Sequence, residues 1–282
     1  MRTRAQKNRT LALTNTGRLS LFALGCGSAF ARTLGQNNYL IVKGDTHLLI
    51  DCGTKTPARL SAHGVELTDI RNYLITHSHA DHIGGLEEAM LMGRYVARSR
   101  PRILIEEAYE SVLWNHSLKG GAAPNERHQG QTLSFSDFWD VLRPTPRTDL
   151  PRNCAEFVIG TLNVKIFRTN HFPEQARSWD TAAYSVGMLL DDTVLFTGDT
   201  KFDASLISDF EKHCDIQTIF QDAQFFTGGV HASIYELADL PEHQKARMHL
   251  MHYADSFESR EAEIRELGFQ GFVRENTWYS WP

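Results

Sequence analysis

Short runs of alternating hydrophobic and polar residues recur along the chain between turn-forming residues, a pattern typical of β-strands. The expected strands cover residues 18–24, 39–42, 47–50, 73–76, 102–105, 163–169, 183–189, 193–197, 216–220 and 248–251. Hydrophobic spacings of three and four predict helices over residues 57–63, 83–91, 204–210, 233–238 and 256–267. Because two β-rich halves each carry flanking helices, the pattern favours an α/β (α+β) sandwich over a doubly wound parallel sheet.

The first 17 residues lack this pattern and carry Arg2, Arg4, Lys7 and Arg9. Polar residues at positions 15–18 interrupt the apolar segment that a secretion signal needs, so residues 1–17 are expected to form a basic, flexible tail. Residues 18–282 contain no repeat or linker and are expected to fold as a single domain. We expect no membrane-spanning helix, because no run of about 18 apolar residues occurs.

Residues 114–135 also depart from the pattern, with Gly120, Gly121, Pro124 and Gly130 among polar residues. A loop of this length in a compact domain commonly serves as a lid or binding loop. We therefore expect a lid-like loop here, and a disordered surface excursion is the alternative.

Composition and charge narrow the class of partner. The chain is 41% hydrophobic and 22% charged, as globular proteins are. Its net charge of −5 makes a nucleic acid polymer an unlikely partner and favours a small substrate. The four cysteines form no C-x-x-C pair, which fits a reducing, cytoplasmic setting without a cysteine zinc site.

The candidate chemistry is concentrated in the run His77-Ser-His79-Ala-Asp81-His82, directly after the strand expected at residues 73–76. Alternate side chains of an extended segment share a face, so His77 and His79 can bind one metal ion. Asp81 and His82 lie where the chain turns into a helix, and they can bind a second ion. The alternative is a polar turn with Asp81 as a helix cap, but three histidines at these offsets rarely arise by chance.

Two such pairs cannot complete two metal sites, so further ligands are required at the carboxyl ends of other strands. His171, Asp199 and His252 occupy such positions, each at the end of an expected strand or directly after it. Each of them alone is a weak signal, because an isolated histidine at a strand end is usually a satisfied polar residue. Together they complete two sites, and a carboxylate at Asp199 can bridge two cations.

This order of ligands resembles that of metallo-β-lactamase-fold hydrolases over about residues 19–253. The resemblance implies a four-layered αβ/βα sandwich and two Zn²⁺ ions, with Mn²⁺ as an alternative. It assigns the ligands as His77, His79 and His171 for one ion, Asp81, His82 and His252 for the other, and Asp199 as the bridge. It also implies a catalytic role for Asp81, and it places Asp51 behind the ligands as their support. Asp51 could instead cap the helix that begins near Pro57.

Within the superfamily, Gly25-Cys-Gly-Ser28 and Gly229-Val-His231-Ala-Ser233 resemble motifs of the ribonuclease Z branch and its phosphodiesterase relatives. The resemblance implies that His231 helps to expel the leaving oxygen as a general acid, and an exposed residue before a helix is the alternative. Dinuclear β-lactamases carry cysteine at the position of Asp199, so antibiotic hydrolysis is disfavoured.

The tRNA-gripping arm of ribonuclease Z is missing, since Lys119 and Arg127 are the only Lys or Arg in residues 114–135. The chain is most similar to cyclic-nucleotide phosphodiesterases of the anti-Pycsar type. This implies a homodimer that hydrolyses 3′,5′-cyclic nucleotides to 5′-monophosphates, with a zinc-bound hydroxide attacking phosphorus. No substrate-binding residue can be assigned. The alternatives are a tRNA 3′-endonuclease, a lactone, thioester or β-lactam hydrolase, and an inactive metal-binding module.

Overall fold

The structure is a computed structural model that describes residues 1–7 and 10–282. One eight-stranded sheet is ordered β1-β18-β2-β3-β4-β5-β6-β9. Its strands are β1 Arg2–Ala5, β2 Ser20–Ala23, β3 Tyr39–Lys43, β4 Thr46–Ile50, β5 Asn72–Leu74, β6 Arg102–Leu104, β9 Asp140–Leu142 and β18 Thr277–Ser280. The second sheet is ordered β10 to β17. Its strands are β10 Thr145–Arg147, β11 Cys154–Ile159, β12 Leu162–Arg168, β13 Val186–Leu190, β14 Val194–Phe196, β15 Thr218–Asp222, β16 Met248–Met251 and β17 Gly271–Phe272.

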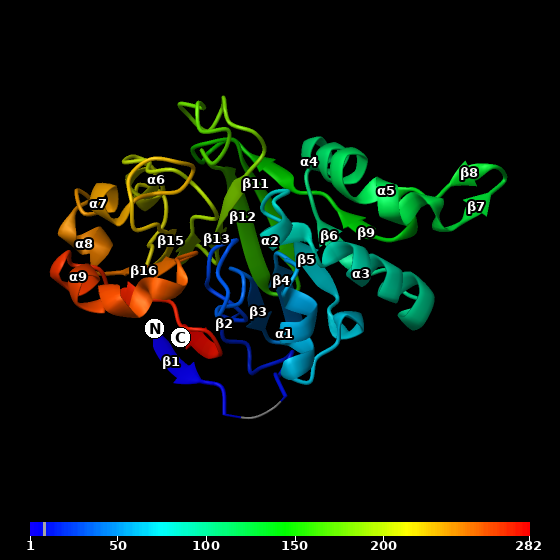
Figure 1. Cartoon of the computed structure of the whole chain (residues 1–282), viewed down its shortest axis with the longest axis horizontal. Helices are drawn as coiled ribbons and strands as arrows, with labels where there is room; N and C mark the ends of the chain where they lie inside the picture. The colour runs from blue at the N-terminus through cyan, green and yellow to red at the C-terminus, as the bar shows by residue number, and fades with distance from the viewer. Residues whose placement is uncertain (8–9) are drawn as a thin grey trace.

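Helices flank both sheets (Figure 1). The α-helices are α1 Thr56–Ala62, α2 Ala80–Ile83, α3 Leu86–Leu91, α4 Glu107–Leu113, α5 Lys119–Ala122, α6 Leu206–Glu211, α7 Ile234–Leu237, α8 Glu242–Lys245 and α9 Glu261–Glu266. Short 3-10 turns occur at Leu67–Asp69, Ala123–Asn125, Phe135–Asp137 and Asp255–Arg260, and π-helical turns at Met92–Ala97 and Trp114–Leu118. Within residues 1–7 and 10–282, no helix has the length and apolar character needed to cross a membrane.

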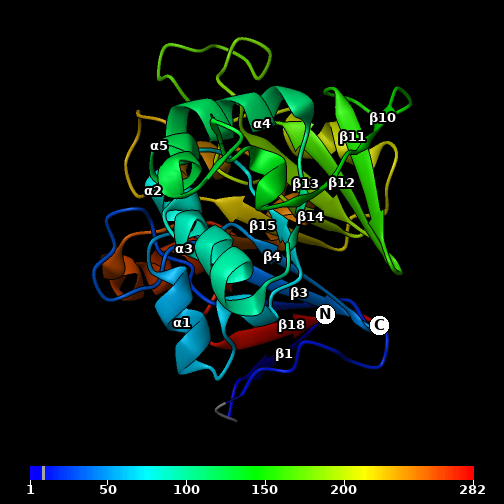
Figure 2. The same cartoon turned by 90° about the vertical axis from the view of Figure 1, so that its right-hand side faces the viewer.

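Successive side chains along each strand of the first sheet point to opposite faces, and this divides the hydrophobic core into two layers. In the first sheet, Leu21, Leu48 and Ile50 belong to the cluster that also contains residues of the second sheet, such as Phe157. The intervening Phe22 and Leu49 belong to a second cluster with residues of α1, α3 and α4. Figure 2 shows these helices on the outer side of the first sheet. The sandwich expected from the sequence is confirmed, because each strand face has its own apolar partner.

Strand direction brings several chain segments to one edge of the sandwich. Strands β4, β5, β6 and β9 run parallel, and so do β14, β15, β16 and β17. Strand β12 is antiparallel to β13, which is antiparallel to β14, so β12 shares the direction of β14. The carboxyl ends of β12, β14, β15 and β16 therefore meet at the same edge.

The amino-terminal segment differs from the flexible tail expected for residues 1–17. Residues Arg2–Ala5 form β1, which pairs antiparallel with β18 at the other end of the chain. Both termini therefore lie side by side in Figure 1. The strand was not predicted because its side chains are all exposed and carry no hydrophobic alternation. Residues 8 and 9 of the expected tail lie outside the described residues.

Residues 114–135 do not form the irregular loop that the sequence suggested. They contain the π-helical turn at Trp114–Leu118, α5, the 3-10 turn at Ala123–Asn125 and the hairpin of β7 Arg127–His128 and β8 Gln131–Thr132, which projects to the right in Figure 1. Trp114 and Phe135 are buried, with ring centroids 5.9 Å apart. Gly121 of α5 faces α3, where a Cβ would lie 2.3 Å from the carboxylate of Glu87, an exposed side chain that can move aside. A role as a lid stays a prediction.

Candidate metal centre

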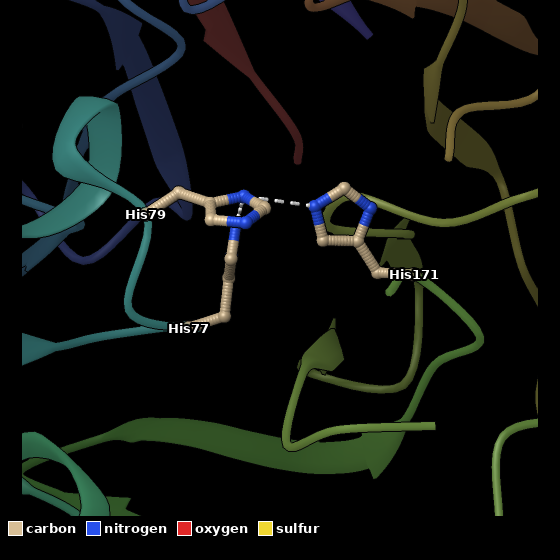
Figure 3. A group of neighbouring side chains, drawn as sticks. All are labelled: His77, His79 and His171. Carbon is tan, nitrogen blue, oxygen red and sulfur yellow. Dashed lines mark hydrogen bonds between the residues drawn. The ribbon is translucent and has the colours of Figure 1, made fainter. Parts of the chain in front are cut away.

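Three histidines from two segments converge at the edge of the sandwich (Figure 3). His77 and His79 follow β5, and His171 follows β12. Nδ1 of His79 lies 2.9 Å from Nε2 of His77 and 3.1 Å from Nε2 of His171. Ligand atoms of one tetrahedral zinc ion lie roughly 3.3 Å from one another, so the three nitrogens have the spacing of a single coordination sphere.

A second group lies beside the first and contains Asp81, His82, Asp199 and His252. Nε2 of His82 is 3.2 Å from Oδ2 of Asp81 and 3.2 Å from Oδ2 of Asp199. Nε2 of His252 is 3.2 Å from Oδ2 of Asp81 and 3.3 Å from Oδ2 of Asp199. All four side chains are buried, so this cluster of alternating carboxylates and imidazoles is shielded from bulk water.

Asp199 lies between the two groups. Its Oδ2 is 3.9 Å from Nε2 of His77 and 3.8 Å from Nε2 of His171, in addition to its short distances to His82 and His252. Both of its carboxylate oxygens are buried without a hydrogen-bond partner among the described residues, as is Nε2 of His82. Burying such groups without a partner costs free energy, and a divalent cation would supply the missing interaction. The residues therefore fit a metal.

Hydrogen bonds to neighbouring groups determine which ring nitrogen of His77 and of His171 is available to bind a metal ion. Nδ1 of His171 donates to the carbonyl oxygen of Val230 at 2.9 Å. The Thr76 hydroxyl donates to Asp51, so Nδ1 of His77 donates to Thr76 Oγ1 at 3.0 Å. Both histidines therefore present Nε2 as a lone pair, which is the form that binds a cation.

Burial also keeps these rings neutral. It lowers the pKa of His171 to about 3, and it lowers the pKa of His77 well below its usual range. Burial disfavours the charge of Asp199 as well, but the His252 and His82 rings outweigh it and hold the pKa of Asp199 well below its usual range. Burial also lowers the pKa of His82, but the carboxylates of Asp199, Asp51 and Asp81 outweigh it and raise that pKa well above its usual range. The neutral His77 and His171 rings suit metal binding, and beside His82 a divalent cation would supply the positive charge that these carboxylates favour.

Asp51 lies behind this cluster, directly after β4. Its Oδ2 accepts from Nδ1 of His82 at 2.6 Å, and its Oδ1 accepts from the backbone N–H of Thr76 at 2.7 Å. The Asp51 backbone has a positive φ of 61°, which turns the carboxylate toward His82 as the chain leaves the strand. Asp51 therefore orients His82, and its side chain makes no cap of α1, whose N-cap residue is Lys55.

His231 lies at the open side of the centre, two residues before Ser233, the N-cap of α7. Its ring centroid is 4.5 Å from that of His252 and 4.9 Å from that of His171. Its Nδ1 is 2.7 Å from Oδ2 of Asp222, the last residue of β15. Burial lowers the pKa of His231, but the Asp222 carboxylate outweighs it and raises that pKa to about 9.

The structure thus brings together all the site residues named from the sequence, and it adds Asp222, which was missed. Asp222 is the last residue of a buried strand, and Asp199 and His252 come shortly after the ends of other buried strands. A polar residue at the end of an apolar run is therefore a sequence signal that could have identified Asp222 as well. Its other oxygen, Oδ1, lies 3.5 Å from Nδ1 of His252. Asp222 therefore lies between His231 and the candidate ligand His252 and contacts both.

Comparisons with known proteins show the family to which this chain is similar. Residues 19–279 match the family model described as "Anti-Pycsar protein Apyc1". An anti-Pycsar protein Apyc1 of Bacillus phage BSP38 is 37% identical over 246 residues, which cover 83% of this chain and 89% of that protein. An anti-Pycsar protein Apyc1 of Paenibacillus sp. (strain J14) is 31% identical over 263 residues, which cover 93% of this chain and 99% of that protein.

A solved structure shows the same fold. The metallo-β-lactamase fold protein YhfI from Bacillus subtilis superposes with a TM-score of 0.67 at 16% identity, covering 94% of this chain and 100% of that one. The expected metallo-β-lactamase sandwich is therefore confirmed. The match of the family model over nearly the whole chain, and relatives above 30% identity, show that this chain belongs to the anti-Pycsar protein Apyc1 family.

Proposed function

We propose that this protein is a dinuclear-zinc phosphodiesterase that hydrolyses 3′,5′-cyclic nucleotides to 5′-monophosphates. The observation that carries the proposal is the position of Asp199 between two groups of candidate ligands, with His231 beside them. Membership of a family whose proteins are named anti-Pycsar supports it, because the sequence resemblance to that type implies cyclic-nucleotide substrates.

In this proposal His77, His79 and His171 would hold one ion, and Asp81, His82 and His252 would hold the other. Asp199, whose two buried carboxylate oxygens have no hydrogen-bond partner among the described residues, would be shared by the two ions. When bound, the ions would lower the pKa of a water molecule and polarise a phosphoryl oxygen of the substrate. Mn²⁺ is the alternative to Zn²⁺. The catalytic role of Asp81 stays a prediction, and its Oδ2 lies 3.2 Å from Nε2 of both His82 and His252.

His231 acts on the leaving group. Its Nδ1 is held by Asp222, so Nε2 is left to donate a proton to the departing 3′ oxygen. Asp222 positions the ring and stabilises its protonated form, as a carboxylate behind a catalytic imidazole does. The side chain of His231 is 20% exposed, so a substrate at the mouth of the site can reach it.

The alternatives fit the observations less well. A tRNA substrate is disfavoured by the net charge of −5 and by the shortage of positive charge in residues 114–135. A carbonyl substrate such as a lactone is disfavoured by the family match, because the resemblance to the anti-Pycsar type implies a cyclic-nucleotide substrate. A homodimer, and a cytoplasmic location, stay predictions from the sequence.

A turnover panel tests the proposed function. Purified, metal-loaded protein is incubated with 3′,5′-cyclic mononucleotides, a precursor tRNA, a chromogenic β-lactam and an acyl-homoserine lactone. We expect conversion of cyclic nucleotides with broad base tolerance, since the ligands surround the phosphate position and not the base. Intact cyclic nucleotides together with correctly trimmed tRNA would replace this function with that of a tRNA endonuclease.

Metal content is a separate prediction. Purified protein is expected to carry close to two zinc or manganese ions per chain, because the seven candidate ligands form two groups and Asp199 of the second lies within 3.9 Å of two histidines of the first. Elemental analysis after saturation and desalting measures this ratio. One ion or none per chain would contradict the dinuclear centre.

A further inference from the structure

Two of the candidate ligands, Asp81 and His82, are carried by α2, which is only four residues long. The carbonyl oxygens at the end of a helix have no N–H four residues ahead to pair with. The N–H of Gly85, which would close the next turn on the carbonyl oxygen of Asp81, donates instead to that of Cys52 at 2.8 Å. The backbone of this ligand-bearing turn therefore needs donors from elsewhere in the chain.

The segment that follows β4 packs directly against this turn. The backbone N–H of Cys52 donates to the carbonyl oxygen of His82 at 2.8 Å. A Cβ on Gly53 would lie 2.0 Å from the carbonyl oxygen of Asp81, and neither backbone can move aside alone. Glycine at position 53 is therefore required for this close approach.

The side chain of Asn38, directly before β3, supplies the donor for Asp81. Its Nδ2 donates to the carbonyl oxygen of Asp81 at 3.1 Å. Its Oδ1 accepts from the backbone N–H of Gly53 at 2.9 Å and from the hydroxyl of Thr56. Because the Gly53 N–H can only donate, it fixes which end of the amide faces Asp81. One amide thus joins the segment after β4 to the turn that carries two candidate ligands.

Asn38 is itself held at both of its backbone groups. Its carbonyl oxygen accepts from the N–H of Leu24 at 3.1 Å and from that of Gly25 at 3.3 Å, and its N–H donates to the carbonyl oxygen of Gln36 at 2.7 Å. The residue is only 1% exposed, so its amide is shielded from competing water. The side chain of Asn38 therefore starts from a fixed point in the fold.

From these contacts we infer that Asn38 is a positioning residue for the metal ion that Asp81, His82 and His252 would hold. The inference rests on the dinuclear centre of the proposed function. By binding the Asp81 backbone, Asn38 fixes the point from which the carboxylate extends, and Oδ2 of Asp81 lies 3.2 Å from Nε2 of both histidines. Groups that support metal ligands in this way tune the affinity for the metal.

The other candidate ion should depend much less on Asn38, because its ligands are held by different neighbours. Nδ1 of His77 donates to Oγ1 of Thr76 at 3.0 Å, and Nδ1 of His171 donates to the carbonyl oxygen of Val230 at 2.9 Å. Loss of the Asn38 amide is therefore expected to weaken one of the two ions selectively.

The test titrates metal-free protein with Zn²⁺ in competition with a chromophoric chelator, which gives a dissociation constant for each ion. Asn38→Ala is expected to weaken one ion by about 10- to 100-fold and to leave the other within about threefold of the wild-type value. Asn37→Ala is the matched control, because Asn37 is also 1% exposed but its Oδ1 accepts from the hydroxyl of Tyr39 at 2.7 Å. The control should keep both dissociation constants.

A second variant tests the same turn while leaving Asn38 in place. Gly53→Ala adds a Cβ against the carbonyl oxygen of Asp81 and is expected to weaken one ion selectively, as Asn38→Ala does. Gly120→Ala is its control, because Gly120 is exposed and has open space around it. Circular dichroism checks that each variant is folded, and Gly53→Ala decides the question if Asn38→Ala is not.

The outcomes separate this inference from the proposed function. Unchanged affinity for both ions in the folded variants, or an equal loss of both ions, would overturn the positioning role and leave the proposed function standing. If the wild-type protein binds two ions but hydrolyses no cyclic nucleotide, the proposed function fails, and the two dissociation constants still decide the role of Asn38. Fewer than two ions in the wild-type protein would overturn both.

Discussion

Changing Asp199 to alanine is expected to abolish turnover of cyclic nucleotides while most of the fold remains intact. Oδ2 of Asp199 lies within 3.9 Å of Nε2 of four histidines, so no other side chain in the described structure can take its place between the two groups. Charge stabilisation by bound metal is worth several kcal/mol, so the loss in kcat should be on the order of 10³-fold or more.

The measurement combines initial rates, metal content and far-ultraviolet circular dichroism on the same preparation. Asp180→Ala is the matched control, because Asp180 is an exposed loop aspartate whose side chain accepts from Ser178. The control should keep wild-type activity and metal content. Full activity in Asp199→Ala would remove the bridging role.

Changing His231 to alanine is expected to leave the metal content unchanged but to lower turnover of cyclic nucleotides by roughly 10²- to 10⁴-fold, the usual effect of losing a general acid. The reason is geometric. The Asp222 carboxylate engages Nδ1 of His231, so its Nε2 is free to protonate an alkoxide leaving group. A nitrophenolate leaves without protonation, so the loss on a nitrophenyl phosphodiester should be much smaller.

His243→Ala provides the control for this second variant, because His243 is an exposed histidine on α8. Rates on both substrates and metal content are measured in parallel for the two variants and the wild-type protein. Equal losses on both substrates in His231→Ala, or loss of metal, would contradict the assignment of His231 to the leaving group.

The candidate centre could be predicted from the sequence because its signals are local. His77 and His79 are two residues apart at a strand end, and His171, Asp199 and His252 follow short apolar runs that are recognisable one at a time. Asp222 was missed because the expected strand ended at residue 220. Strand β15 extends to Asp222, which places this aspartate at the same edge of the sandwich as His171, Asp199 and His252.

The elements that were missed depend on contacts between distant residues. Strand β1 has an exposed side chain at every position, and only its pairing with β18 defines it. Glycine in residues 114–135 suggested a loop, but Gly121 is where α5 packs against Glu87 of α3.

The most direct test of the central claim is product analysis in ¹⁸O-labelled water. Metal-loaded protein is incubated with 3′,5′-cyclic AMP, and the products are separated and examined by mass spectrometry and ³¹P NMR. Attack of water on phosphorus with departure of the 3′ oxygen predicts 5′-AMP that carries one ¹⁸O on phosphorus. Cyclic AMP that stays intact at full metal loading, or a 3′-monophosphate product, would contradict the account.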